Sequence, residues 1–157
     1  MTMDLTQYQQ PEIIQAALSQ RRIAVVGMSA NHLRASYFVG FYLQRHGYQV
    51  IPVNPRESEI LGQVCYPSVT EIHEPPDVIN VFRDPAAVPG IAEEAVAVGA
   101  KYLWLQFGVI SETGAAIAEA GGVQVIMDRC IKVEHARYRG RMHWLGFNTE
   151  QISAQRA

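Results

Sequence analysis

Ile23-Ala-Val-Val-Gly27-Met28-Ser29 is the stretch that decides the fold of this chain. It is a continuous apolar run that ends in glycine and serine, which is typical of a buried β-strand followed by a tight turn. A second run, Tyr48-Gln-Val-Ile-Pro-Val53, ends in Asn54-Pro55. A nucleotide-binding α/β fold starts this way, but the second run lacks the acidic residue that holds the ribose of NAD. The two runs therefore indicate a nucleotide ligand other than NAD.

The composition indicates a globular protein with one domain. The 157 residues allow a sizeable core, which we expect at about residues 21–132, followed by a C-terminal tail at 133–157. Hydrophobic residues make up 48% of the chain, an ordinary fraction for such a protein. A net charge of −2 argues against a nucleic-acid partner. Because no apolar run approaches the roughly 18 residues of a membrane span, we expect no membrane partner either.

The two cysteines, Cys65 and Cys130, have no metal-ligand spacing. Two cysteines in a chain of this size are more often free thiols than a disulfide, and free thiols are typical of the reducing cytoplasm. We therefore expect a cytoplasmic protein. The histidines form no metal-binding pattern, and neither a Gly-x-Ser-x-Gly turn nor a Gly-Lys-Ser/Thr phosphate loop occurs. Glu93-Glu94 is interpreted as part of a solvated helix face.

The order of elements predicts a Rossmann-like α/β fold. Continuous apolar runs predict five strands, at residues 23–27, 48–53, 78–82, 102–107 and 123–127. Capping and turn residues predict helices at 11–19, 36–45, 68–74, 89–98 and 111–120, with Ser36 capping the second of these. The alternation predicts a doubly wound, mainly parallel sheet with helices on both faces. We expect the strand order 3-2-1-4-5 and a ligand crevice at the carboxyl ends of the first and fourth strands.

The residues after the first two strands are candidates for binding a phosphorylated ligand. Gly27, Met28 and Ser29 form a turn whose backbone could approach phosphate closely, and Arg34 and Ser36 add hydrogen-bond donors. After the second strand, Asn54 and Pro55 fix an extended turn, and Arg56 could meet a phosphate. The alternative for both segments is a plain turn, with a serine cap in the first and a solvated arginine in the second.

The later strands end in further candidates. Phe82 could cover a flat ring while Arg83 reaches a phosphate, unless Arg83 simply pairs with Asp84. Gln106 is polar inside an apolar run and needs a partner, either a ligand or neighbouring backbone. Gly108 would permit close approach of a ligand. Cys130 is either a reactive thiol beside Arg129 or, more commonly for a free cysteine, a small buried hydrophobe. After Arg129 the chain is less regular, and residues 143–147 are expected to cover a sheet edge or to form a homodimer contact.

Six of these segments, in this order, resemble the CoA-binding protein family, whose fold is that of the CoA-binding domain of the succinyl-CoA synthetase α subunit. The matching segments begin at Ala24, Arg34, Gly47, Val81, Trp104 and Met127, and together they span about residues 21–132. The resemblance implies a Rossmann-like domain that binds coenzyme A. It implies that Gly27–Ser29 and Arg34 lie near the ADP phosphates, and that Asn54, Pro55 and Arg56 border the adenosine. Phe82, Arg83 and Val88 would then line its flank, and Gln106 and Gly108 would face the pantetheine.

The lack of an acidic residue at the end of the second strand agrees with this resemblance. CoA carries a 3′-phosphate on its ribose, and an acidic residue there would repel it. The sequence therefore favours a non-enzymatic module that binds CoA or an acyl-CoA. An NADP-type oxidoreductase is the first alternative, with Arg34 or Arg56 receiving the 2′-phosphate. The second alternative is a thiol-redox role, in which Cys130 forms a mixed disulfide with CoA.

Overall fold

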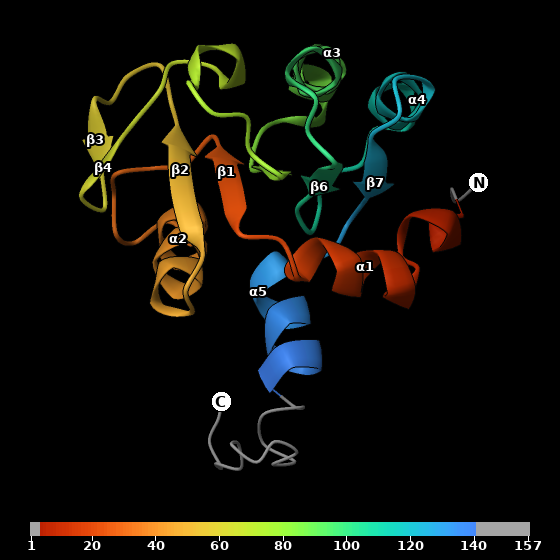
Figure 1. Cartoon of the computed structure of the whole chain (residues 1–157), viewed down its shortest axis with the longest axis horizontal. Helices are drawn as coiled ribbons and strands as arrows, with labels where there is room; N and C mark the ends of the chain where they lie inside the picture. The colour runs from red at the N-terminus through yellow and green to blue at the C-terminus, as the bar shows by residue number, and fades with distance from the viewer. Residues whose placement is uncertain (1–3, 141–157) are drawn as a thin grey trace.

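The computed structural model describes residues 4–140, which form a five-stranded sheet between two layers of helices (Figure 1). The strands of the sheet are β1 (Arg22–Val26), β2 (Gln49–Val53), β5 (Val78–Val81), β6 (Tyr102–Leu105) and β7 (Gln124–Ile126). A small hairpin of β3 (Glu59–Ile60) and β4 (Gln63–Val64) follows β2. The α-helices are α1 (Pro11–Leu18), α2 (Ala35–Arg45), α3 (Val88–Val98), α4 (Glu112–Ala120) and α5 (Ile131–His135). Short 3₁₀ turns are η1 (Thr6–Tyr8), η2 (Val69–Glu71) and η3 (Pro85–Ala87), and a π-helical turn, η4 (Ala136–Gly140), continues α5.

The predicted fold class is confirmed, but the predicted strand order is wrong. The strands lie in the order β2-β1-β5-β6-β7, all parallel, so the third strand of the sheet pairs with β1 and not with β2. The outer edge of β2 is already occupied near its end. Tyr66 donates its backbone N–H to Pro52 and accepts one from Asn54. Because the segment after the hairpin pairs there, β5 crosses to the other side of β1.

This order also moves the crevice. The chain passes from β1 to β2 on one side and returns to β5 on the other, so the strand order reverses between β1 and β5. Ligands of open parallel sheets bind at such a reversal, outside the carboxyl ends of the strands. The first and fourth strands, between which we expected the crevice, are not neighbours. The crevice is therefore expected between the loops that follow β1 and β5.

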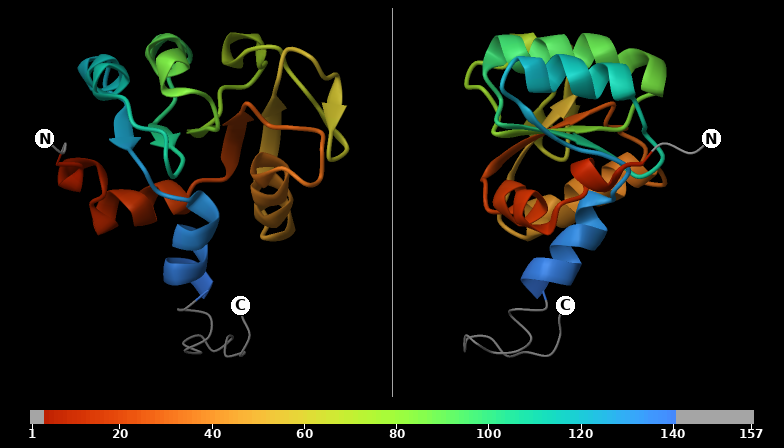
Figure 2. Two further views of the ribbon diagram at one scale, coloured as in Figure 1. Left: turned by 180° about the vertical axis from the view of Figure 1, so that it is seen from behind. Right: turned by 90° about the vertical axis from the view of Figure 1, so that its right-hand side faces the viewer.

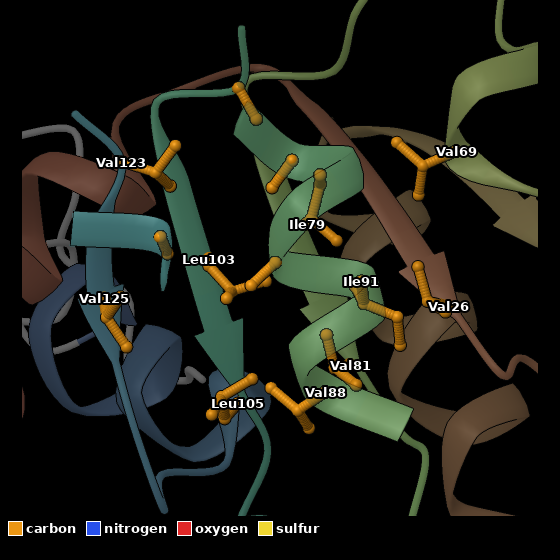
Figure 3. Packing of buried hydrophobic residues seen from close by; sticks show 14 of the residues in the cluster. Val26, Val69, Ile79, Val81, Val88, Ile91, Leu103, Leu105, Val123 and Val125 are labelled. Atoms are coloured by element: carbon orange, nitrogen blue, oxygen red, sulfur yellow. The ribbon is translucent and has the colours of Figure 1, made fainter. Parts of the chain in front are cut away.

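The two helical layers bury separate hydrophobic clusters. In Figure 2, α3 and α4 cover one face of the sheet, and α1, α2 and α5 cover the other. Figure 3 shows Val88 and Ile91 of α3 packed over Ile79 and Val81 of the sheet, and all four side chains are buried. Burying a side chain of this size contributes about 1.5–3 kcal/mol, so both faces hold the sheet strongly. Within residues 4–140, no helix has the length and apolar character to cross a membrane.

The helix boundaries follow the expected signals, with one correction. Ser111 accepts the backbone N–H of Gly114 and caps α4, and Gly99 ends α3 in the left-handed conformation. Ser36, in contrast, does not cap α2. It is the second residue of that helix, and its hydroxyl instead accepts the N–H of Ser29 at 2.9 Å. Ser36 therefore fixes the loop that precedes the helix.

Candidate functional site

Two adjoining hollows lie outside the carboxyl ends of β1, β2 and β5. The first, which we call the loop hollow, has a volume of about 350 Å³ and is lined by Gly27, Ser29, Arg34, Ala35, Ser36, Asn54 and Phe82. The second, the proline hollow, has a volume of about 390 Å³ and is lined by Val26, Gly27, Val53, Asn54, Pro55, Arg56, Pro67, Ser68, Arg83, Ile91 and Glu94. Gly27 and Asn54 line both hollows, so the two lie side by side.

A wider cavity, the α5 cavity, continues from the loop hollow toward α5. Its volume is about 730 Å³, and it is lined by Ala35, Phe82, Arg83, Gln106, Phe107, Val109, Arg129, Cys130, Val133, Glu134 and Arg137. Ala35 and Phe82 also line the loop hollow, and Arg83 also lines the proline hollow. The three spaces together form one groove at the strand ends.

Gly27 is required where the loop hollow meets β5. Its φ of +85° is disfavoured for other residues, and a Cβ there would collide with the carbonyl oxygen of Phe82. The rest of the loop is held by its own side chains. Ser29 accepts the N–H of Asn31 at 2.9 Å, and Asn31 accepts the N–H of Leu33 at 2.9 Å. These amides are used within the loop, whereas the first N–H groups of α2, like those of any helix, have no partner within the helix and can face an anion.

Asn54 joins the loops that follow β1 and β2. Its side-chain amide donates to the carbonyl of Met28 at 2.8 Å, and its side-chain oxygen accepts the N–H of Arg56 at 2.8 Å. Both polar atoms of the side chain are therefore engaged in the protein. The geometry supports a positioning role for Asn54, while Pro55 and Arg56 are exposed along the proline hollow.

Three of the five arginines that line the groove supply its unpaired positive charge. Arg34, Arg56 and Arg83 are exposed, and none has a carboxylate partner among residues 4–140. Arg83 does not pair with Asp84, whose carboxylate accepts the N–H of Ala86 at 2.9 Å. Unpaired guanidinium groups around a hollow are suited to phosphate, which they can bind with two parallel hydrogen bonds.

The α5 cavity differs in character, because its walls are largely apolar. Phe82, Phe107, Val109 and Val133 contribute apolar surface, and the side chain of Phe107 is 71% exposed. The polar groups of the cavity are mostly paired.

Gln106 lies at the end of β6 and is satisfied within the protein. Its side-chain oxygen accepts the amide of Asn80 at 3.3 Å and the backbone N–H of Ile131 at 3.3 Å. These bonds tie β6 to the start of α5. They correspond to the alternative in which Gln106 is satisfied by neighbouring protein groups, although the residue still lines the cavity.

Glu134 is buried at the far side of the cavity, where it is bracketed by two arginines. A carboxylate oxygen lies 3.2 Å from Arg137 and 3.9 Å from the Nε atom of Arg129. A buried carboxylate requires such partners. Cys130, at the position preceding α5, is half-buried and is a free thiol that faces the same cavity.

Three predicted residues do not line the groove. Met28 and Val88 are fully buried, Met28 against Gly40 and Val88 against Gly114, so their side chains face the core. Gly108 has a φ of +88° and donates its N–H to Asp128 at 2.7 Å. Gly108 shapes the loop after β6, and it contributes no surface to any of the three hollows.

Two parts of the groove were not predicted from the sequence. The first is the part of the α5 wall beyond Cys130, although Val133, Glu134 and Arg137 follow Cys130 at the i+3, i+4 and i+7 spacing that indicates one helix face. The second is Glu94, which was interpreted as solvated but is half-buried at the proline hollow. Burial raises the pKa of its carboxyl, against a smaller opposite effect of the backbone N–H of Val69. No local pattern distinguishes Glu94 from the exposed Glu93.

The parallel sheet, covered by helices on both faces, defines a Rossmann-like α/β domain with a groove at its strand ends. The family described as the CoA binding domain matches residues 21–136, so the chain belongs to this family. The resemblance indicated by the strand-end motifs is thereby confirmed.

Three similar proteins illustrate the match. Uncharacterized protein YneT from Bacillus subtilis (strain 168) is 42% identical over 125 residues, which cover 80% of this chain and 93% of YneT. The solved structure of a hypothetical protein from Pyrococcus horikoshii OT3 is 33% identical, with a TM-score of 0.83 over 89% of this chain and 99% of that chain. The acetate–CoA ligase (ADP-forming) of Methanocaldococcus jannaschii is 24% identical over 72% of this chain, but the match covers only 17% of the ligase.

Proposed function

We propose that this protein binds coenzyme A by itself, as a single-domain module without catalytic activity of its own. The observation that carries the proposal is the contrast along the groove. Unpaired arginines surround its two smaller hollows, while the α5 cavity is wide and largely apolar. CoA has the same division, with a phosphorylated nucleotide at one end and a long, uncharged pantetheine arm at the other. A cavity of about 730 Å³ is within the usual range for sites that enclose a small molecule.

The proposed pose follows from the charges. The pyrophosphate would lie in the loop hollow, against the first turn of α2 and Arg34. The adenosine would lie in the proline hollow, between Pro55 and Arg83, with Arg56 available to the 3′-phosphate. The pantetheine arm would pass Phe82 and enter the α5 cavity, and its thiol end would approach Cys130.

The first alternative, an NADP-type oxidoreductase, shares the phosphate requirement but not the arm. Calorimetric titration with CoA and with NADP⁺ separates the two. We expect heat from CoA binding at one site per chain and none from NADP⁺ at the same concentrations. Binding of NADP⁺ without binding of CoA would overturn the proposal. Arg21→Ala removes an exposed arginine just before β1, away from the groove. It is the matched control for arginine substitutions in the groove and should leave the CoA titration unchanged.

The second alternative is favoured by one observation, the position of Cys130 in the α5 cavity. In that reaction the Cys130 thiolate attacks CoA disulfide, forms a protein–CoA disulfide and releases one CoA thiol, so no further oxidant is needed. Intact-mass measurement after treatment with CoA disulfide should then show one added CoA, lost in Cys130→Ser and kept in Cys65→Ser. Cys65 is a suitable control because it is buried. If both variants behave alike, the redox role is dismissed.

We also propose that the protein acts in the cytoplasm. Both cysteines are free thiols, which supports action in the reducing cytoplasm. The residues expected to form a homodimer contact, 143–147, lie outside the described residues.

A further inference from the structure

The proline hollow contains one acidic residue that nothing in the proposed pose uses. Glu94 lies on α3 one turn after Ile91, and both residues line the hollow. Among the lining residues it is the only carboxylate, while Arg56 and Arg83 supply two positive charges. The hollow is thus divided between a cationic part and an acidic part.

The apolar surface between these parts suits a flat ring. Pro55, Pro67 and Ile91 line the hollow and have no polar side-chain atoms. A purine would rest against such surface, with its polar edge left to a neighbouring group. The acidic part of the hollow would repel phosphate, so the phosphates belong with the arginines and the base belongs with Glu94.

Glu94 is half-buried on α3, on the side of the helix that lines the hollow with Ile91. Burial raises the pKa of its carboxyl, and the backbone N–H of Val69, at the start of η2, has a smaller opposite effect. Among the described residues, no side chain donates a hydrogen bond to it. A carboxylate can only accept, so the group that satisfies it must be a donor.

We propose that Glu94 selects the nucleobase of the ligand by accepting a hydrogen bond from the 6-amino group of adenine. The inference rests on the proposed function, since it assigns the proline hollow to the adenosine of CoA. Adenine has a donor at this position, whereas guanine and hypoxanthine have a carbonyl oxygen, which a carboxylate repels. Glu94 would therefore favour adenine over a 6-oxopurine, independently of the contacts to phosphate and pantetheine.

The test compares CoA with its deaminated form, in which hypoxanthine replaces adenine and everything else is unchanged. For the wild type, calorimetry should give at least about tenfold tighter binding of CoA, the effect of one good hydrogen bond. For Glu94→Gln the ratio should fall to about one, because an amide can accept from the amine of adenine or donate to the oxygen of hypoxanthine. Glu93→Gln, on the exposed face of α3, should keep the ratio of the wild type.

The outcomes separate the two proposals. If Glu94 only holds η2 against α3, Glu94→Gln will change thermal stability and leave the affinity ratio as it is in the wild type, which overturns the inference alone. Equal binding of CoA and deaminated CoA by the wild type also overturns the inference and leaves the proposed function standing. If neither ligand binds the wild type, the proposed function fails, and the role of Glu94 fails with it.

Discussion

The two ends of the groove are built in different ways. The loop and proline hollows are formed mainly by short turns directly after β1, β2 and β5, and they carry unpaired arginines. The α5 cavity depends on a helix that follows the last strand and packs back against α2, and its walls are mostly apolar. If the proposed function holds, the first end would recognise the charge of the ligand and the second would recognise its shape. Changes at the two ends should have different signatures.

The largest effect is expected at Gly27, where the loop hollow and the proline hollow meet. Gly27→Ala adds a Cβ in a left-handed conformation and against the carbonyl of Phe82, so the free energy of unfolding should fall by about 3 kcal/mol. CoA binding should be lost with the shape of the loop. Urea unfolding and calorimetry measure the two effects.

Gly47→Ala is the matched control for Gly27→Ala. Gly47 also has a positive φ, +93°, but nothing lies within 4 Å of its added Cβ. It should cost only about 1 kcal/mol of unfolding free energy and leave CoA binding intact. Equal losses in the two variants would show that the close approach to β5 is unimportant.

A smaller effect, and one specific to the packing of α5, is expected from His135. Its Nδ1 atom lies 2.9 Å from the hydroxyl of Tyr42, and its ring contacts those of Tyr48 and His46, so it joins α5 to the α2 side. Burial, followed by the charges of His46 and Arg139, lowers its pKa from 6.5 to about 4. The unfolded chain thus takes up a proton at higher pH than the folded protein does, and the stabilisation present above pH 6.5 is lost as the pH falls toward 4.

The free energy of unfolding should fall by about 2 kcal/mol over this range. This is less than the whole pKa shift would give, because solvent screens part of the effect. Urea unfolding between pH 7 and 4 measures it, and His135→Phe should flatten this pH dependence while keeping an aromatic ring in the contact. His73→Phe, at an exposed histidine, should retain the dependence of the wild type. A wild-type stability that does not change over this range would contradict the assignment.

The smallest of these effects is expected at the charged end. Arg34→Ala should weaken CoA binding roughly tenfold, or about 1.5 kcal/mol, if the guanidinium pairs with a phosphate. Because Arg34 is exposed, the unfolding free energy should stay unchanged. The loss should shrink at high salt, since screening weakens exposed charge pairs. An unchanged CoA affinity in calorimetry would remove Arg34 from the site.

The same contrast explains what the sequence could predict. The strand-end turns carry local signals, so the sequence predicts that Gly27, Asn54, Arg56 and Arg83 lie near one another, and all four line the proline hollow. The position of β5 in the strand order could not be predicted in this way. It depends on the pairing of Tyr66 with the edge of β2, and no local sequence pattern indicates that contact.

Burial was the other quantity that local patterns misjudged. Met28 and Val88 were assigned to the site through the family resemblance. The side chain of Met28 faces one hydrophobic cluster and that of Val88 faces the other. Glu94 and its neighbour Glu93 have the same local sequence signal, but the packing of α3 places only Glu94 at the proline hollow. Helical periodicity from Cys130 to Arg137 was available and would have predicted the wall of the α5 cavity.

The most direct test of the account is a crystal structure of the protein with coenzyme A. The account predicts the pyrophosphate beside Gly27 and Arg34, the adenine in the proline hollow, and the pantetheine arm inside the α5 cavity. Coenzyme A bound at another face, or a pantetheine arm that leaves the α5 cavity empty, would contradict it.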